Sequence, residues 1–119
     1  MDINNYVDNA KAQLRRGTLE YCVLAAISQR EMYASDIIAL LKQYDLLVVE
    51  GTLYPILSRL KEAGLASYSW SESNEGPPRK YYSITENGRR AAEVLSTTYE
   101  SLSNSIKQLT QSIWIKQLT

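Results

Sequence analysis

The sequence predicts a mainly α-helical protein with one small β-hairpin and a long C-terminal helix. Apolar residues recur at helical spacing between Leu19 and Leu60, then alternate with serines after Gly64, and follow a heptad pattern from Ala92 onward. The 119 residues are enough for one domain. Three helices followed by a hairpin form the plan of a winged helix-turn-helix domain. We therefore expect such a domain, extended by a C-terminal helix.

The first helices are predicted from apolar spacing and from residues that start or stop helices. Residues 4–15 predict a short helical arm, which Gly17 is expected to interrupt before Thr18 caps a new, strongly apolar helix. A second helix is expected at about 35–44, with Ser35 as its N-cap.

A third helix is better marked at both ends. It is expected at about 52–63, with Pro55 in its first turn and Gly64 as a left-handed C-cap. Leu53, Ile56, Leu57 and Leu60 would form its buried stripe.

A hairpin is predicted after the third helix. Ala66, Tyr68 and Trp70 alternate with serines, which is typical of a strand. We expect residues 73–78 to form a loop and residues 79–84 the return strand. This places Arg79 and Lys80 at the hairpin tip, where two cations could hold phosphate; a solvated turn that protects an edge strand is the alternative.

A long helix is predicted from its cap at Thr85 to the C-terminus. Its apolar residues repeat at alternating spacings of three and four, which is typical of a dimerisation seam. The residues expected at the dimer interface are Leu95, Tyr99, Leu102, Ile106, Leu109 and Ile113. The expected organisation is an N-terminal helical arm (1–16), a winged helix-turn-helix domain (17–85) and a C-terminal dimerisation helix (86–119).

Composition argues against catalysis and metal binding. The chain has no histidine and one cysteine, Cys22, whose apolar neighbours predict a buried thiol. No phosphate loop or nucleophile motif is present. We expect no enzyme activity, no cofactor and no metal. No membrane span or signal peptide is evident, so we expect a cytoplasmic protein.

The expected DNA-binding surface combines the exposed side of the third helix with the wing. The basic and acidic residues number 13 each, so binding to random DNA should be weak. Short hydroxyls, an aromatic ring and local cations suit groove reading, although an exposed helix face is usually only solvated. The candidate DNA-binding residues are Thr52, Tyr54, Ser58, Arg59, Lys61, Arg79 and Lys80.

Four segments together resemble the PadR family of bacterial transcriptional regulators. They are Arg16-Gly17-Thr18-Leu19-Glu20, Tyr33-Ala34-Ser35-Asp36-Ile37, Gly51-Thr52-Leu53-Tyr54-Pro55, and Arg79-Lys80-Tyr81-Tyr82 before Thr85-Glu86-Asn87-Gly88. The resemblance implies a homodimer that binds palindromic operator DNA, often as a repressor, and responds to small effectors. It also implies that the helix containing Tyr54 reads DNA. Two departures are Ala34, where the family often has glycine, and Gly76-Pro77-Pro78, where many members carry arginine.

A ligand site and a competing function remain open at this point. Tyr99 in the dimer seam, with Trp70 and Tyr6 nearby, could wall a pocket for a flat effector, or it could simply pack in the interface. Trp114 is equally ambiguous and could pack against the partner. The alternative function is a winged-helix adaptor that binds proteins rather than DNA, which zero net charge would also suit.

Overall fold

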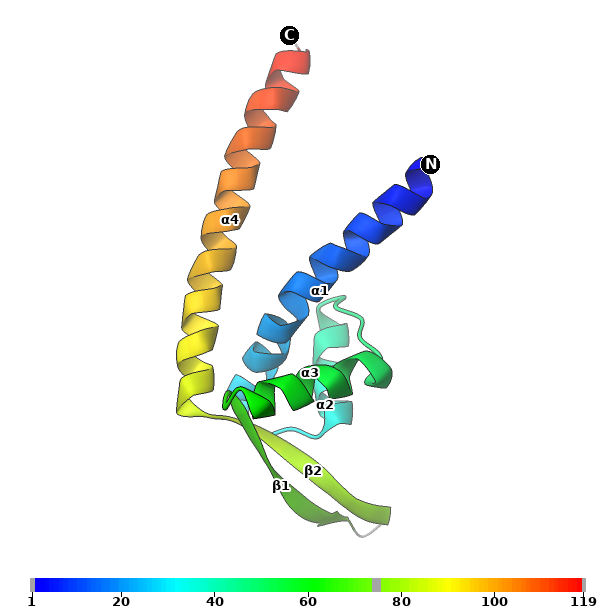
Figure 1. The fold of residues 1–119 in the computed structure, drawn as a ribbon, viewed down its shortest axis with the longest axis vertical. Coiled ribbons are helices and arrows are strands. Elements are labelled where there is room, and N and C mark those ends of the chain that lie inside the picture. The colour runs from blue at the N-terminus through cyan, green and yellow to red at the C-terminus, as the bar shows by residue number, and fades with distance from the viewer. Residues whose placement is uncertain (1, 74–75, 119) are drawn as a thin grey trace.

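The fold is three packed helices, a two-stranded antiparallel hairpin and one long final helix, as the sequence predicts. Figure 1 shows the computed structural model, which describes the backbone of residues 2–73 and 76–118 and the side chains of 2–72 and 76–113. The elements are, in order, α1 (Ile3–Gln29), α2 (Ala34–Gln43), α3 (Glu50–Glu62), β1 (Ala66–Ser73), β2 (Gly76–Ile84) and α4 (Glu86–Leu118). α1 and α4 both extend away from the hairpin and diverge (Figure 1).

The core lies where the C-terminal half of α1 meets α2, α3 and the base of the hairpin. Leu24 of α1, Ile37 of α2 and Leu53 of α3 are fully buried there. Met32, in the segment before α2, exchanges two backbone hydrogen bonds with Tyr82 of β2. This bridge attaches the base of the hairpin to the helical core.

α1 is one continuous helix, so the expected interruption at Gly17 is wrong. The side chain of Asp2 caps the helix by accepting a hydrogen bond from the backbone N–H of Asn4. Thr18 does not cap anything; its hydroxyl donates back to the carbonyl oxygens of Leu14 and Arg15. A single glycine inside a helix costs only about 1 kcal/mol relative to alanine, which long helical neighbours tolerate. The expected division after residue 16 therefore falls inside a helix.

The starts of α2 and α3 also differ from the prediction. The N-cap of α2 is Tyr33 rather than Ser35, and Asp36 accepts from the Tyr33 backbone N–H at 3.1 Å. α3 begins at Glu50, so Pro55 is its sixth residue and does not lie in the first turn as predicted. Its ring leaves the carbonyl of Gly51 without the usual helical donor.

The end of α3 agrees with the prediction. Gly64 adopts a left-handed φ of 78°, and the N–H of Leu65 donates to the carbonyl of Leu60 at 2.9 Å. These features form a Schellman motif, which turns the chain directly into β1.

The hairpin is longer than predicted. Gly76, Pro77 and Pro78 belong to β2 and not to a loop, and Arg79 pairs across the strands with Ser71. Arg79 and Lys80 therefore lie within the strand and not at the tip. Residues 74 and 75 of the predicted loop lie outside the described residues.

α4 starts at a cap that the sequence predicts. The Thr85 hydroxyl accepts from the N–H of Gly88 at 3.0 Å and donates to the carbonyl of Gly64 at 2.7 Å. Gly88 is buried so closely that a Cβ there would lie 2.0 Å from the carbonyl oxygen of Leu65. The first turn of α4 is thus fixed to the turn between α3 and β1.

None of the helices, over the residues that the structure describes, is long and apolar enough to cross a membrane.

Candidate nucleic-acid interface

The orientation of α3 is set by four buried side chains on one stripe. Leu53, Ile56, Leu57 and Leu60 pack in the core and have at most 4% of their surface exposed. The remaining positions of the helix face outward or sideways because a helix turns 100° per residue. Ser58 lies on the side opposite the core and is exposed.

The candidate residues of α3 divide between two sides of the helix. Tyr54 and Lys61 lie on the side of the hairpin. The ammonium of Lys61 is 5.3 Å from the ring centroid of Tyr68 on β1, and Tyr54 lines a shallow depression with Trp70 and Lys80. These residues bring α3 and the wing into one continuous surface.

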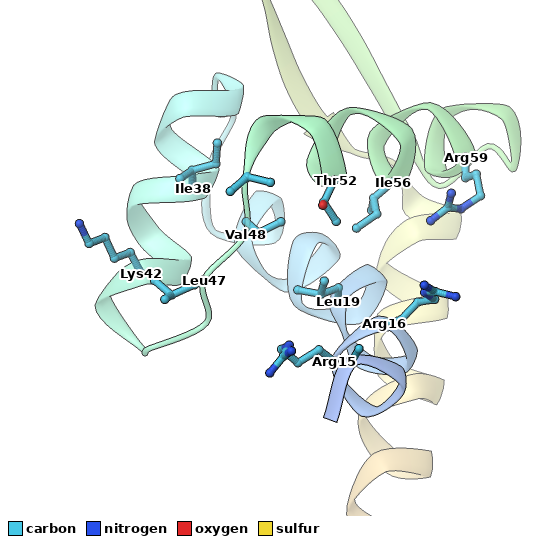
Figure 2. A pocket seen from close by; sticks show the side chains of 12 residues that line it. Arg15, Arg16, Leu19, Ile38, Lys42, Leu47, Val48, Thr52, Ile56 and Arg59 are labelled. Atoms are coloured by element: carbon cyan, nitrogen blue, oxygen red, sulfur yellow. The ribbon is translucent and has the colours of Figure 1, made fainter. Parts of the chain in front are cut away.

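Thr52 and Arg59 lie on the other side of α3, toward α1. The Nε of Arg59 donates to Oε1 of Glu20 on α1 at 2.6 Å. Figure 2 shows Thr52 and Arg59 along one cavity with Arg15 and Arg16 of α1. The structure therefore does not bring all seven candidate residues to one face.

Arg79 and Lys80 point to opposite faces of the hairpin because neighbours in a strand alternate. The Lys80 ammonium lies 4.5 Å from the ring centroid of Tyr68 and 5.4 Å from that of Trp70. The Arg79 guanidinium lies 5.6 Å from the ring centroid of Tyr33 on the N-terminal side of α2. Each cation is thus held over an aromatic ring while its charge stays accessible.

The aromatic supports of these cations are the residues that sequence reasoning missed. Tyr33 donates from its hydroxyl to Ser71 at 3.2 Å and packs edge-on against Tyr81, with ring centroids 4.6 Å apart. The ring of Tyr68 contacts the ammonium groups of both Lys61 from α3 and Lys80 from β2. Alternation of Tyr68 and Trp70 in the sequence indicated a shared strand face, but nothing in the sequence indicated that Tyr33 reaches the wing.

Acidic side chains lie beside this basic surface. Glu50 lines the depression that Tyr54 and Lys80 also line, and Glu62 is exposed at the end of α3. They lower the local positive potential, which agrees with the zero net charge of the chain. Such a surface attracts random DNA weakly and relies on specific contacts.

Burial raises the pKa of two side chains, Tyr82 and Cys22. Burial, and after it the neighbouring hydroxyls of Tyr54 and Tyr68, raises the pKa of Tyr82, which therefore remains a neutral phenol. Burial likewise raises the pKa of the Cys22 thiol. Among the residues with described side chains, no three His, Cys, Asp or Glu residues gather to hold a metal ion.

The predicted seam residues of α4 share one exposed stripe in the single chain. Leu102 is 59% exposed and Tyr99 54%, and the other members are also exposed, namely Leu95, Ile106, Leu109 and Ile113. The hairpin that carries Trp70 and the upper part of α4 lie in opposite directions from their junction (Figure 1). Within one chain the structure therefore does not bring Trp70 to Tyr99, and the side chain of Trp114 lies outside the described residues.

The element order and the wing define a winged helix-turn-helix protein. The family model of the transcriptional regulator PadR-like family matches residues 23–94, and the chain belongs to this family. The family consists of transcriptional regulators, so the expectations of a regulator and of a non-enzyme are confirmed.

Solved structures give the same result. A PadR-like transcription factor from Bacteroides fragilis is 46% identical, with a TM-score of 0.73, over 85% of this chain and 98% of that one. A PadR family regulator from Eggerthella lenta is 30% identical over 92% of both chains, with a TM-score of 0.77. A PadR-like regulator from Bacillus cereus is 35% identical over 83% of this chain and 97% of that one, with a TM-score of 0.72. No curated protein matches the chain significantly.

Proposed function

We propose that the protein is a homodimeric repressor that binds a specific operator in the cytoplasm and is released by a small effector. The observation that carries DNA binding is the continuous surface formed by Tyr54 and Lys61 of α3 with Lys80 of the wing. α3 would enter the major groove, with Ser58 foremost, while the wing holds the backbone. Thr52 and Arg59 would face one wall of the groove, and Arg79 would contact phosphate from the outer face of the wing.

The exposed stripe on α4 supports the dimer. Its 33 residues correspond to roughly 50 Å of helix at 1.5 Å per residue, far longer than the small core that it leaves. A second α4 is the economical way to cover six apolar side chains that the single chain leaves exposed. In such a dimer two copies of α3 would sit about 34 Å apart, in successive major grooves.

Fluorescence anisotropy with duplex DNA tests the proposal. The probe is the sequence immediately upstream of the protein's own gene, titrated at two salt concentrations beside a scrambled duplex of equal length. We expect saturable binding that prefers the upstream duplex and weakens as salt rises. Equal, weak binding to both duplexes would show that the operator does not lie in the upstream sequence used as the probe. No binding to either at low salt would favour the alternative of a protein-binding adaptor.

The effector proposed from the sequence would sit at Tyr99 in the dimer seam. The support is the exposed phenol ring on an apolar stripe. Titration of aromatic compounds against tryptophan fluorescence, repeated in a Tyr99→Ala variant, tests this position. A saturable change that the variant abolishes would support it, and a signal that the variant leaves unchanged would place the effector elsewhere.

A further inference from the structure

A separate cavity lies on the side of the domain away from the hairpin. It has a volume of about 820 Å³, is open to solvent on one side, and is lined by α1, the C-terminal part of α2, the segment before α3, and α3 itself (Figure 2). Leu19, Ile38, Val48 and Ile56 make its floor apolar. Pockets of this size and composition are typical of small-molecule sites.

The rim of this cavity is cationic. Arg15 and Arg16 come from α1, Lys42 from α2 and Arg59 from α3. Figure 2 shows Lys42 on one side of the opening and Arg16 with Arg59 on the other. Among the described residues, the one ion pair at this rim is that of Arg59 with Glu20. The other three cations have no carboxylate within ion-pair distance in the described part of the chain.

An apolar floor beneath unpaired cations suits a molecule that has an acidic group at one end and an apolar body at the other. We propose that this cavity binds an amphipathic organic anion, with its acidic group at Arg15, Arg16 and Lys42 and its apolar body on Leu19 and Ile56. The acidic group can be a carboxylate, a sulfonate or a phosphate, because guanidinium and ammonium groups donate hydrogen bonds to the oxygens of each of them. In the regulator proposed above, this anion would act as the effector from a site other than Tyr99, and the variants below distinguish the two sites.

Two other occupants fit less well. The C-terminal part of α4 from a second copy would bring Lys107 and Lys116 and no acidic residue between 101 and 118, so its charge repels the rim. The DNA backbone would match the cations but would leave Leu47, which is 71% exposed, facing phosphate. An amphipathic anion satisfies both the charge and the apolar surface.

The cavity also touches the helix that would read DNA. Thr52, Ile56 and Arg59 of α3 form part of its wall. An anion beside Arg59 competes with Glu20 for the same guanidinium, and its apolar body contacts Ile56. Occupancy therefore changes contacts that hold α3 against α1, which gives the ligand a direct route to DNA affinity.

Competition binding on the whole protein tests the site. Anilinonaphthalene sulfonate, an aromatic anion whose fluorescence rises in apolar sites, serves as the probe, and decanoate and decanol serve as competitors of equal chain length. We expect decanoate to displace the probe and decanol to do so much less well. Arg15→Gln with Lys42→Gln should weaken decanoate binding about tenfold, a loss of about 1.4 kcal/mol. Leu47→Ser, at an exposed position, should weaken it without unfolding the domain.

Matched control variants distinguish binding in this cavity from binding at other surface cations or in the α4 seam. Lys11→Gln with Lys107→Gln removes the same charge outside the cavity and should leave decanoate affinity unchanged. Equal affinity in the rim and control variants would overturn the proposal, and so would loss of binding in Tyr99→Ala, which would place the ligand in the seam. Binding to a monomeric Leu102→Glu variant but not to the wild type would also overturn it, because a second copy would then cover the cavity.

The link to regulation rests on the proposed function and is measured separately. Decanoate should lower operator affinity of the wild type and of the control variant, but not of the rim variant. The displacement assay contains no DNA, so it measures anion binding even if the protein binds no duplex. Failure of the anion site and failure of the proposed function can therefore be distinguished. Anion binding without any change in operator affinity would overturn the role as effector.

Discussion

Arg59 of α3 and Glu20 of α1 form an ion pair with 2.6 Å between Nε and Oε1, and both side chains remain accessible to water. An exposed pair of this kind adds at most about 1 kcal/mol to stability. Its larger effect is on the direction of Arg59, which it holds toward α1 and away from the wing. In the proposed complex Glu20 would therefore compete with DNA phosphate for this guanidinium.

Glu20→Gln should release Arg59 and strengthen DNA binding. We expect operator affinity to rise about threefold and the slope of log affinity against log salt to steepen by up to about 0.9, the contribution of one phosphate contact. Fluorescence anisotropy at several salt concentrations measures both quantities. Arg59→Ala should weaken operator binding, and Glu20→Gln should have no effect on slope in that background. An unchanged slope in the single variant would contradict the interpretation.

Lys80→Ala should weaken binding to all DNA sequences alike. Lys80 is held over Tyr68 and Trp70 on the wing and is proposed to contact phosphate, which carries no sequence information. The salt slope should flatten by about one unit for operator and scrambled duplex. Lys107→Ala removes an equal charge from α4 and is the control. A loss confined to the operator would instead assign base reading to Lys80.

Leu102→Glu should separate the proposed dimer into monomers. The side chain is 59% exposed in the single chain, so the substitution should leave the domain folded while placing like charges in the seam. Light scattering gives the mass, and circular dichroism confirms the helix content. Asn104→Glu, on the opposite side of α4, should remain dimeric. A dimeric Leu102→Glu protein would refute the seam.

Gly88→Ala should destabilise the protein, whereas Gly17→Ala should stabilise it. A Cβ at position 88 would lie 2.0 Å from the carbonyl oxygen of Leu65 and 2.7 Å from Cγ1 of Ile84, so the start of α4 must shift. Overpacking of this kind costs about 1–3 kcal/mol. At Gly17 no atom lies within 4 Å, and helix propensity should add about 0.5–1 kcal/mol. Urea denaturation of both variants measures the difference, and effects of equal sign would contradict it.

Cys22 should react slowly with thiol reagents near neutral pH. Burial raises the pKa of its thiol, so the reactive thiolate becomes scarcer than in an exposed cysteine. Alkylation by iodoacetamide, followed by mass spectrometry, should be slow in native protein, should quicken as pH rises and should be fast in urea. Rapid modification of the folded protein at neutral pH would show that the thiol is accessible.

The fold could be predicted because its main signals are local. Helical spacing of apolar residues, the glycine that ends α3 and the threonine that caps α4 each depend on a few neighbouring residues. The errors have physical causes too. Gly17 does not break α1 because the flanking helical segments outweigh the cost of one glycine. Pro77 and Pro78 are tolerated in β2 because the register is irregular between Ser71 and Ser73, so neither proline is paired with a residue of β1.

The candidate site was only partly predictable for a different reason. A helical wheel places residues around α3 but does not say which neighbour lies on each side, so Tyr54 and Arg59 were assigned to one surface. The contact of Tyr33 with Arg79 joins residues 46 positions apart and follows from tertiary packing. The cavity between α1 and α3 has the same origin, because its rim cations come from three helices.

The close packing of Gly88 against Leu65 and Ile84 makes the base of the wing the point about which α4 would tilt. A tilt of 10° there would displace the far end of a roughly 50 Å helix by about 9 Å. Small movements of α3 against the turn at Leu65 would therefore appear enlarged at the distal end of α4. In a dimer the dependence would also hold in the other direction: the angle at which the two α4 helices cross would set the distance between the two copies of α3.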